Sequence, residues 1–575
     1  MPLPNTEIAR LLREIADLLE IQNANPFRVR AYRNAARTVE EHPDSVAAIA
    51  ARDPKGLTAI SGVGKDLAVT IAEIAKDGTA KALRDLRAEA PAGALEMRSV
   101  PNVGPKRARI LAERLGIRTR EALLEATRAG RLADEPGLGA AIQAKILRDL
   151  EAHREEEHRI SRAAAAQYAE PLLERLRRVP GVTAAEIAGS FRRARESVGD
   201  IDMLARAEHA SKVIDAFTSA PEAADVIESG ATKAAIRLRN GMRVDLRVFD
   251  RESYGAGLHY FTGSKAHNIV VRKLGQAKGL KINEYGVWKG ERRVSGREEQ
   301  DVFDAVGLPW IPPEMREDRG EIEAARARKL PDVLRLADIK GDLQSHSTGS
   351  DGRNTIEEMA RAAEALGYEY LAVTDHSPAV RVTNGMDDAG FKRQARAIDK
   401  LNAKLKKLTV LKGAEVDIHK DGSLDLSDAT LAALDIVLVS IHSHFDLPPA
   451  AQTARVVKAL SHRSVDIFAH PTARLIGRRR PAAFDLDAAI RAALDHGVMM
   501  EIDAQPERLD LDDVSARTAH ERGVMLTIGT DAHAVPELSG MRWGVDQARR
   551  AWVDKKGIAN TRPLARLLKL LHAAR

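Results

Sequence analysis

The chain has 575 residues, too many for one hydrophobic core, and at about 150 residues per domain we expect three to five domains. With 44% hydrophobic and 30% charged residues it reads as a globular protein, and no apolar run approaches the roughly 18 residues of a membrane helix. The start carries no signal-peptide core, and the lack of cysteine excludes disulfides, thiolate metal sites and cysteine nucleophiles, so we expect a cytoplasmic protein without a membrane partner.

Charge and histidine are distributed unevenly along the chain. Residues 1–340 hold 57 Lys and Arg against 51 Asp and Glu, whereas residues 341–575 hold 32 of each. This excess of positive charge favours polyanion binding by the first part. Ten of the 17 histidines lie between 341 and 540. Because imidazole is a frequent metal ligand, we look for a metal site in the last third.

The first 150 residues are predicted to form short helices, with amphipathic periodicity over 8–21, 28–41, 67–76 and 108–115. Three similar turns interrupt them, each a small residue, an apolar residue and a glycine, spaced 40 and 35 residues apart. One such turn is common between helices, but three in a net-positive segment favour phosphate binding by backbone N–H groups. They resemble helix-hairpin-helix motifs, which bind the DNA backbone without reading sequence. The residues expected to bind DNA there are Gly62, Gly64, Lys65, Gly104, Lys106, Gly137 and Gly139.

The most specific motif lies between residues 188 and 202, where a Gly-Ser turn and two arginines precede Asp200-x-Asp202. Residues i and i+2 of a strand share a face, so both carboxylates can hold the same cations. Oxygen ligands without His or Cys favour Mg²⁺. Asp245, in a second strand-like segment, offers a third carboxylate. Three carboxylates around two Mg²⁺ ions suit in-line phosphoryl transfer, whereas a bare Asp-x-Asp would indicate only a solvated strand edge.

This motif is the nucleotidyltransferase signature, and its details resemble DNA polymerase family X, as does the segment Tyr260-Phe-Thr-Gly-Ser264 with Asn268. The resemblance implies that the three aspartates hold the metals and that Asp245 is the base for the primer 3′-hydroxyl. It implies a nucleotide site formed by Gly189, Ser190, Arg193, Gly199, Tyr260, Phe261, Gly263 and Asn268. Lys265 departs from the family member DNA polymerase beta, which has an acid there.

The same resemblance bears on the N-terminal domain. Arg28 and Tyr32 match the family's 5′-phosphate pocket, whereas Thr70 stands where the family has its nucleophilic lysine. A hydroxyl cannot form the Schiff base of a 5′-deoxyribose-phosphate lyase. Lys65 and Lys76 are five and six residues away, not on the same helix face as Thr70. The lyase activity is therefore expected to be absent, whereas binding of the 5′-phosphate by Arg28 and Tyr32 is expected to be retained.

After residue 338 the pattern changes to short apolar strands, most of which end in polar clusters. The expected strands are 339–345, 370–374, 410–416, 436–441, 465–469, 498–502 and 524–530. Helical segments between most of them predict a parallel sheet or barrel, which brings the strand ends to one rim. Mixed imidazole and carboxylate ligands suit Mn²⁺, Fe²⁺ or Zn²⁺. We therefore expect a phosphoesterase with two or three metals and a metal-bound hydroxide nucleophile.

These strand ends resemble the polymerase-and-histidinol-phosphatase (PHP) domain, which follows the polymerase core in bacterial family X enzymes. The ligands that the resemblance implies are His346, Asp351, His376, Glu415, His442, His470, Asp531 and His533. Gln344 replaces the first histidine of the usual His-x-His, which bears on three-metal occupancy. His419 and His444 are left out as second-sphere or surface residues.

The expected fold is multidomain, α+β and α/β, with a helical N-terminal region, a nucleotidyltransferase palm with fingers and thumb, and a distorted seven-stranded β/α barrel. The expected domains are a DNA-binding domain 1–85, fingers 86–160, palm 161–250, thumb 251–315, a linker 316–338 and the PHP domain 339–575. The predicted protein is a monomeric, nucleoid-associated DNA polymerase. It fills short gaps with a 5′-phosphate or extends primer-template DNA from dNTPs, and its barrel processes 3′ ends.

Two alternatives stay open from sequence alone. A DNA-binding scaffold with a vestigial polymerase site would be expected to have lost one of the three aspartates, and all three are present. A small-molecule phosphatase with a nucleic-acid-binding appendage would require the barrel to hydrolyse free phosphate esters. Exonuclease, 3′-phosphatase and abasic endonuclease activities are not distinguished either.

Overall fold

The computed structural model describes residues 5–22, 24–40, 46–60, 63–98, 103–133, 135–157, 159–379 and 383–571, together with residues 3 and 100. The chain divides into two compact units, Met1–His158 and Arg159–Arg575, which are considered separately. None of the described helices combines the length and apolar character needed to cross a bilayer.

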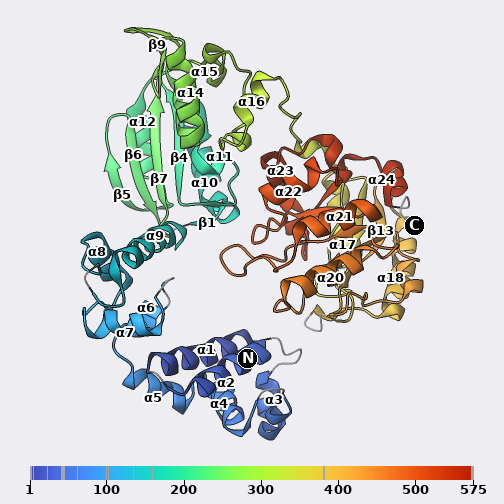
Figure 1. The fold of residues 1–575 in the computed structure, drawn as a ribbon. Helices are drawn as coiled ribbons and strands as arrows, with labels where there is room; N and C mark the ends of the chain where they lie inside the picture. The colour runs from blue at the N-terminus through green and yellow to red at the C-terminus, as the bar shows by residue number, and fades with distance from the viewer. Residues whose placement is uncertain are drawn as a thin grey trace. The chain divides into compact units, whose positions relative to one another are not determined.

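The first unit is helical (Figure 1). Its described residues include two larger apolar cores. Helices α1 and α2 pair in the first core because apolar residues recur at helical spacing, as at Ile8, Leu12, Ile15 and Leu19 of α1, all buried. Residues between 97 and 150 form the second core. The elements are α1 Asn5–Ile21, α2 Pro26–Glu40, α3 Val46–Arg52, η1 Pro54–Ala59, α4 Lys65–Asp77, α5 Lys81–Glu89, α6 Ala94–Arg98, α7 Pro105–Glu113, α8 Arg120–Arg128 and α9 Gly139–Glu157.

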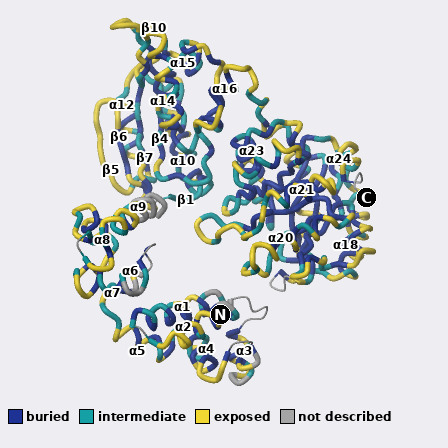
Figure 2. The backbone as a smooth tube through the Cα atoms, viewed as in Figure 1, coloured by how far each residue is buried: buried dark blue, intermediate teal, exposed yellow. Residues whose placement is uncertain are grey.

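The palm is a five-stranded sheet in the order β2-β4-β7-β6-β5, with β4 and β7 parallel and the other pairs antiparallel. Apolar side chains on one face pack against helices α10 and α12, while β5 is an exposed edge (Figure 2). Its elements are β1 Ile160–Ser161, α10 Arg162–Arg177, β2 Val182–Ile187, α11 Gly189–Arg192, β3 Ser197–Val198, β4 Asp200–Ala207, α12 Ala210–Thr218, β5 Ala223–Ser229, β6 Lys233–Leu238 and β7 Arg243–Phe249.

The thumb combines helices with the small sheet β10-β9-β8. The expected linker 316–338 contains helix α16, whose Ile322 and Ala325 are buried in the same apolar core as Met315. The sequence pattern did not predict this helix because the segment is charged and has few apolar residues. Its Glu321 is nevertheless fully buried. The elements are α13 Tyr254–Thr262, α14 Lys265–Ala277, β8 Lys281–Asn283, β9 Gly286–Lys289, β10 Arg292–Ser295, α15 Glu299–Val306, η2 Pro313–Met315, α16 Glu321–Arg326 and η3 Leu336–Asp338.

The C-terminal domain is built on seven parallel strands in sequential order, with helices following most of them. All seven expected strands are present, and the interior is almost wholly buried (Figure 2). The strands are β11 Gly341–Asp342, β12 Tyr370–Val373, β13 Thr409–Asp417, β14 Ile436–Ser440, β15 Ile467–Phe468, β16 Met499–Asp503 and β17 Leu526–Gly529. The helices are α17 Ile356–Ala365, α18 Asp388–Asn402, α19 Asp428–Leu431, α20 Pro449–Leu460, α21 Leu486–His496, α22 Asp513–Glu521, η5 Val535–Gly540, α23 Met541–Arg550, η6 Lys555–Gly557, η7 Ala559–Thr561 and α24 Leu564–Leu571.

The predicted fold class is confirmed: a helical region, a palm with a thumb, and a nearly closed parallel barrel. Element boundaries differ from the expected ranges where local capping sets them. Helix α2 starts at Pro26, two residues before the expected range, since proline is well suited to the first helical position. Helix α4 starts at Lys65 directly after Gly64, which is its N-cap.

Candidate active sites and nucleic-acid contacts

The palm carboxylates lie on two neighbouring parallel strands. Asp200 and Asp202 belong to β4 and Asp245 to β7, and the strand register places Asp202 directly opposite Asp245. The intervening Ile201 and Met203 point into the helix-covered core, so the aspartates occupy the other face of the sheet. The structure therefore brings all three predicted carboxylates to one face and one end of the sheet.

The pKa of Asp202 reflects the repulsion between the three neighbouring carboxylates. Burial, with the neighbouring charges of Asp200 and Asp245, raises the pKa of Asp202 to about 7. Bound cations stabilise the charged form of a buried acid that has other acids beside it, and oxygen ligands suit Mg²⁺. Gly189 borders the group with φ of +61°, and a Cβ there would lie 2.5 Å from Asp202 Oδ2. Glycine is therefore required at this position of the Gly-Ser turn.

Asp245 has a partner that the sequence did not reveal. Arg243, two residues earlier on β7, donates from Nε and Nη2 to the two Asp245 oxygens, both at 2.7 Å. Within the described part of the chain, the acid and histidine groups with ligand atoms within 4.8 Å of one another lie in the barrel, and the palm aspartates are not among them. Asp245 thus contacts Arg243 in this structure.

The predicted nucleotide residues lie on or directly beside α11, α13, α14 and β4. Gly189 and the half-buried Ser190 open α11, and Gly199 directly precedes β4. Arg193 Nη1 donates to the Thr262 carbonyl oxygen at 2.6 Å, beside Gly263 at the end of α13. The remaining three residues lie around the end of α13: Tyr260 packs edge-on against Phe261, and Asn268 Nδ2 donates to the Tyr260 carbonyl oxygen at 2.8 Å.

A second arginine of the motif has a structural role. Arg192, which directly precedes Arg193 in the motif, forms two hydrogen bonds with buried Glu299, at 2.6 and 3.0 Å. Glu299 also binds fully buried Arg316 at 2.6 Å and Trp310 Nε1 at 2.9 Å. Burial acts to raise the pKa of Glu299, but the two arginines offset it and hold the pKa well below its usual range. These contacts fix α11 to the thumb helix α15.

We expect Glu299→Gln to lower the free energy of unfolding by about 3–5 kcal/mol, because it leaves the buried Arg316 charge uncompensated. The exposed pair Arg297–Glu252 supplies a matched control, and Glu252→Gln should change stability by about 1 kcal/mol at most. Urea unfolding at pH 7 measures both.

The pH dependence of this effect follows from the lowered pKa. The Glu299 contribution is present above its unfolded pKa near 4.5 and is lost as the pH falls toward the folded value. The difference between wild type and Glu299→Gln should thus shrink below pH 4.5. Equal losses for Glu299→Gln and Glu252→Gln at pH 7 would contradict the role assigned to Glu299.

In the barrel, Glu415 lies at the centre of the histidine cluster. Its carboxylate oxygens lie 2.7 Å from His470 Nε2, 3.2 Å from His442 Nε2 and 3.3 Å from His346 Nε2. His376 Nδ1 is 3.6 Å away. All four side chains reach Glu415 from different strand ends, as expected for one rim of a parallel barrel.

The other predicted ligands complete this rim. Asp531 Oδ1 lies 3.0 Å from His346 Nε2, and Asp351 Oδ2 lies 3.4 Å from His533 Nε2. Three overlapping groups have all their ligand atoms within 4.8 Å of one another. They are His346, Asp351, His376 and His533; His376, Glu415 and His442; and His346, Glu415 and Asp531. Seven of the eight predicted ligands belong to these groups, and the eighth, His470, contacts Glu415.

The cluster fits divalent metal ions on its own chemistry. The buried Nδ1 atoms of His346, His376 and His470 have no hydrogen-bond partner among the described residues. Imidazole nitrogens facing carboxylates suit Mn²⁺, Fe²⁺ and Zn²⁺. His470 and Asp531 also have positive φ angles of 27° and 49°, a costly backbone conformation that is found most often at functional sites.

The sequence pattern missed a layer of polar residues behind the cluster. Glu501 Oε2 accepts a hydrogen bond from the His470 backbone N–H at 2.8 Å, and Asp417 Oδ1 accepts one from that of His442 at 3.1 Å. Gln344, in place of a histidine, donates to Glu415 Oε2 at 3.1 Å. Asp417 is two residues from Glu415 on β13, which is the only signal that could have identified it.

The two histidines that were left out of the ligand set stay outside it in the structure. His419 lies 3.3 Å from Asp425 and its side chain is 43% exposed, and His444 is exposed. Neither belongs to the ligand groups found in the described part of the chain.

The three turns of the first unit share one geometry. In each, the apolar residue is buried and its N–H bonds to the carbonyl three residues earlier, at 3.0 Å: Val63 to Ile60, Val103 to Val100 and Leu138 to Glu135. Gly64 and Gly104 are N-caps of α4 and α7, and Gly139 starts α9. Gly137 lies two residues before Gly139, and Lys65 is exposed. Gly62 lies outside the described residues, as does the side chain of Lys106.

The residues compared with the family's 5′-phosphate pocket and lyase nucleophile lie on helices α2 and α4. Tyr32 on α2 is buried, and its hydroxyl lies 3.4 Å from Thr70 Oγ1 on α4. Arg28 is exposed one turn before Tyr32. Thr70, which stands where the family resemblance places a lysine, is therefore adjacent to Tyr32.

Comparison with protein families agrees with this division of the chain. The family described as "Helix-hairpin-helix domain" matches residues 3–80, and "SAM-like Helix-hairpin-helix tandem" matches 94–152. "DNA polymerase beta thumb" matches residues 257–317, and "PHP domain" matches 342–505.

Among characterised proteins, the chain is 38% identical to the DNA polymerase/3′-5′ exonuclease PolX of Bacillus subtilis (strain 168), over 97% of both chains. The chain belongs to the bacterial family X DNA polymerases with a C-terminal PHP domain. Relatives of the barrel alone include a "Probable phosphatase" of Thermoanaerobacter sp. (strain X514), 27% identical over 38% of this chain and 89% of the relative. Another, from Acetivibrio thermocellus, is 29% identical over 33% of this chain and 78% of the relative.

Membership of this family identifies an enzyme with a DNA polymerase core and a PHP domain, and implies divalent metals. The family X resemblance inferred from the Asp200 and Tyr260 motifs is confirmed, as is the PHP resemblance of the barrel. The roles of individual residues stay predictions supported by their geometry.

Proposed function

We propose that this protein is a DNA repair polymerase that fills short gaps and removes 3′-terminal nucleotides with its barrel. The observation that carries the proposal is the presence of both sites in one chain, with the three aspartates on one sheet face and the eight barrel ligands at one rim. A vestigial polymerase site would not be expected to keep this register. We further propose that it acts as a monomer on chromosomal DNA in the cytoplasm.

In the palm, Asp200, Asp202 and Asp245 would hold two Mg²⁺ ions, which lower the pKa of the attacking hydroxyl and neutralise the leaving pyrophosphate. Arg193 and the Gly189–Ser190 turn would bind the triphosphate. Tyr260, Phe261 and Asn268 would contact the nucleotide sugar and base. Asp245 would accept the proton of the primer 3′-hydroxyl, which requires it to exchange a hydrogen bond with Arg243 for one with the primer.

In the barrel, the imidazole and carboxylate ligands would hold two or three ions of Mn²⁺, Zn²⁺ or Fe²⁺, which supply a hydroxide nucleophile at neutral pH. Glu501 and Asp417 orient His470 and His442 through their backbone N–H groups. The hydrolysed bond would be the phosphodiester of the 3′-terminal nucleotide. Because relatives of the barrel alone are named phosphatases, 3′-phosphate removal is the second candidate activity.

A primer-extension assay on a one-nucleotide gap tests this proposal. With Mg²⁺ and dNTPs the labelled primer should lengthen by one nucleotide, and with Mn²⁺ and no dNTPs it should shorten. Gaps with a 5′-phosphate should be filled in preference to those with a 5′-hydroxyl, because Arg28 and Tyr32 would bind that phosphate. A 3′-phosphorylated primer in the same assay separates phosphatase from exonuclease activity.

We also predict that the 5′-deoxyribose-phosphate lyase is absent. Thr70 occupies the nucleophile position beside Tyr32, and its hydroxyl cannot form the imine. Borohydride treatment with a pre-incised abasic duplex should trap no covalent adduct in wild type. An adduct that maps to Lys65 or Lys76 would show that the chemistry had moved to another lysine.

A further inference from the structure

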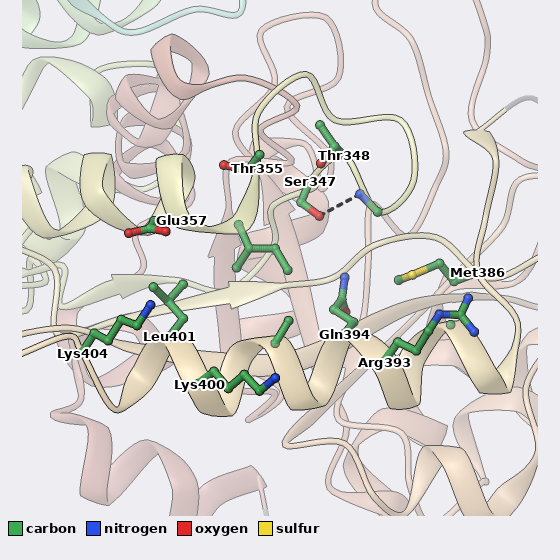
Figure 3. Close-up of a pocket in the computed structure, with 14 residues that line it drawn as sticks. Ser347, Thr348, Thr355, Glu357, Met386, Arg393, Gln394, Lys400, Leu401 and Lys404 are labelled. Atoms are coloured by element: carbon green, nitrogen blue, oxygen red, sulfur yellow. Dashed lines mark hydrogen bonds between the residues drawn. The ribbon is translucent and has the colours of Figure 1, made fainter.

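A pocket of about 550 Å³ lies in the barrel domain beside the metal-ligand loop (Figure 3). One wall is the segment Ser347–Gly349, which connects the ligands His346 and Asp351, and the start of α17. The opposite wall is α18, running below that segment in Figure 3. The pocket therefore begins at the loop that presents two ligands to the metal cluster.

A buried carboxylate joins the two walls. Asp375, next to the ligand His376, accepts hydrogen bonds from the Ser347 hydroxyl at 2.5 Å and the Ser350 hydroxyl at 2.6 Å. It also accepts one from the Gln394 side chain of α18. Because Asp375 is fully buried, these contacts hold α18 at a fixed position relative to the ligand loop.

The lining of the pocket is strongly basic on its α18 side. Arg393 and Lys400 are exposed on α18 and share one helix face with Ala397, and the exposed Lys404 lies in the turn that directly follows this helix. Among the described residues no ion pair is formed by these three cations. The single lining acid, Glu357, has its own partner in Arg361 at 3.5 Å.

We infer that this pocket binds the backbone of a single DNA strand whose 3′ end lies at the metal cluster. The inference rests on the proposed 3′-end processing and specifies where its substrate strand lies. From Arg393 to Lys400 the helix rises about 10 Å, which corresponds to roughly three nucleotides of a stacked strand. A volume of about 550 Å³ lies in the range of small-ligand sites, which suits a short stretch of a single strand. The apolar lining residues Ile356, Met386 and Leu401 can contact nucleotide bases but form no hydrogen bonds with their edges. The pocket would therefore bind a DNA strand independently of its nucleotide sequence.

The test compares two triple variants of the full-length protein. The pocket variant is Arg393→Ala with Lys400→Ala and Lys404→Ala. The matched control is Lys392→Ala with Arg396→Ala and Lys407→Ala, which removes the same charge from exposed residues of the same segment outside the pocket. Each protein is assayed with Mn²⁺ on a 5′-labelled single-stranded oligonucleotide and on the p-nitrophenyl ester of thymidine 5′-monophosphate, a phosphodiester too short to extend along α18.

For the pocket variant we expect kcat/KM on the oligonucleotide to fall about tenfold more than on the small ester, through KM. The slope of log(kcat/KM) against log[salt] should decrease by about 2, since each phosphate contact on a single strand contributes about 0.7. The control should retain the wild-type values. Equal losses on the two substrates, or the same effect in the control, would overturn the inference.

A measurement independent of catalysis separates this inference from the proposed function. An oligonucleotide with 5-iodouracil near its 3′ end is photocross-linked to the full chain and the adducts are mapped. Cross-links within 386–404 or 347–357 that disappear in the pocket variant support the inference even if no hydrolysis is detected, a result that would contradict only the proposed function. Cross-links confined to residues outside both segments would overturn it.

Discussion

Asp200→Asn and Asp202→Asn are each expected to reduce primer extension by roughly 10³-fold or more. Each substitution removes a carboxylate from the face of the sheet where Asp202 is buried beside two other acids. Bound cations would stabilise these negative charges. Loss of a single electrostatic group at a reacting centre typically costs about 10²–10³ in kcat, and a direct metal ligand should cost at least that much. Single-turnover extension of a one-nucleotide gap measures the loss.

The sheet supplies a control for these variants. Asp225 is exposed on β5 of the same sheet, so Asp225→Asn should extend at the wild-type rate. DNA binding measured by fluorescence anisotropy should survive in all three variants, because the helix-hairpin-helix turns lie in the first unit. Extension that persists in Asp200→Asn would refute the assignment of the palm site.

The second large effect is expected in the barrel. His346→Gln and Asp531→Asn should each reduce 3′-end degradation by at least about 10²-fold, because loss of a residue that merely orients a metal ligand already costs 10- to 100-fold. Gap filling should stay near the wild-type rate. Metal content measured by mass spectrometry should fall together with the activity, since His346 belongs to two of the three ligand groups.

A matched histidine tests this reading of the barrel. His419→Gln alters an exposed histidine outside the ligand groups and should change neither metal content nor degradation. If degradation instead disappears in Asp200→Asn and persists in His346→Gln, the nuclease belongs to the palm.

Contiguous motifs made the sites largely predictable from the sequence. Asp200 and Asp202 are two residues apart on one strand, and each barrel ligand lies near the C-terminal end of an apolar strand or in the loop after it, so short-range spacing carries the information. The same logic gave the seven strands, although β11 is only the pair Gly341–Asp342 where 339–345 was expected. Beyond Asp342, Ser345 forms a separate bridge with Ala532 directly before the ligand His346.

Interactions between distant residues left no such signal. Arg192 and Glu299 form their hydrogen bonds although 107 positions separate them in the sequence. The residues next to each of them in the sequence do not indicate that it is buried. Asp375 stands beside a recognised ligand, but its hydrogen bonds to Ser347 and Gln394 depend on how α18 packs. The sequence did not predict helix α16 because its charged residues are typical of an exposed segment. Glu321 is nevertheless fully buried, and it is paired there with His267 at 2.8 Å.

The barrel ligands come from the ends of six of the seven parallel strands, with β16 the exception. An unfolded chain holds no such site, so ions that bind here bind the native state alone and add RT ln(1 + [M]/Kd) to its stability. Metal supply and folding of this domain are therefore thermodynamically linked. Consider a substitution in the barrel core, far from any ligand, that destabilises the domain enough to populate the unfolded state. It then weakens the apparent affinity for metal by the same free energy by which it lowers the stability of the fold. Depletion of metal in the medium then becomes equivalent to a destabilising mutation.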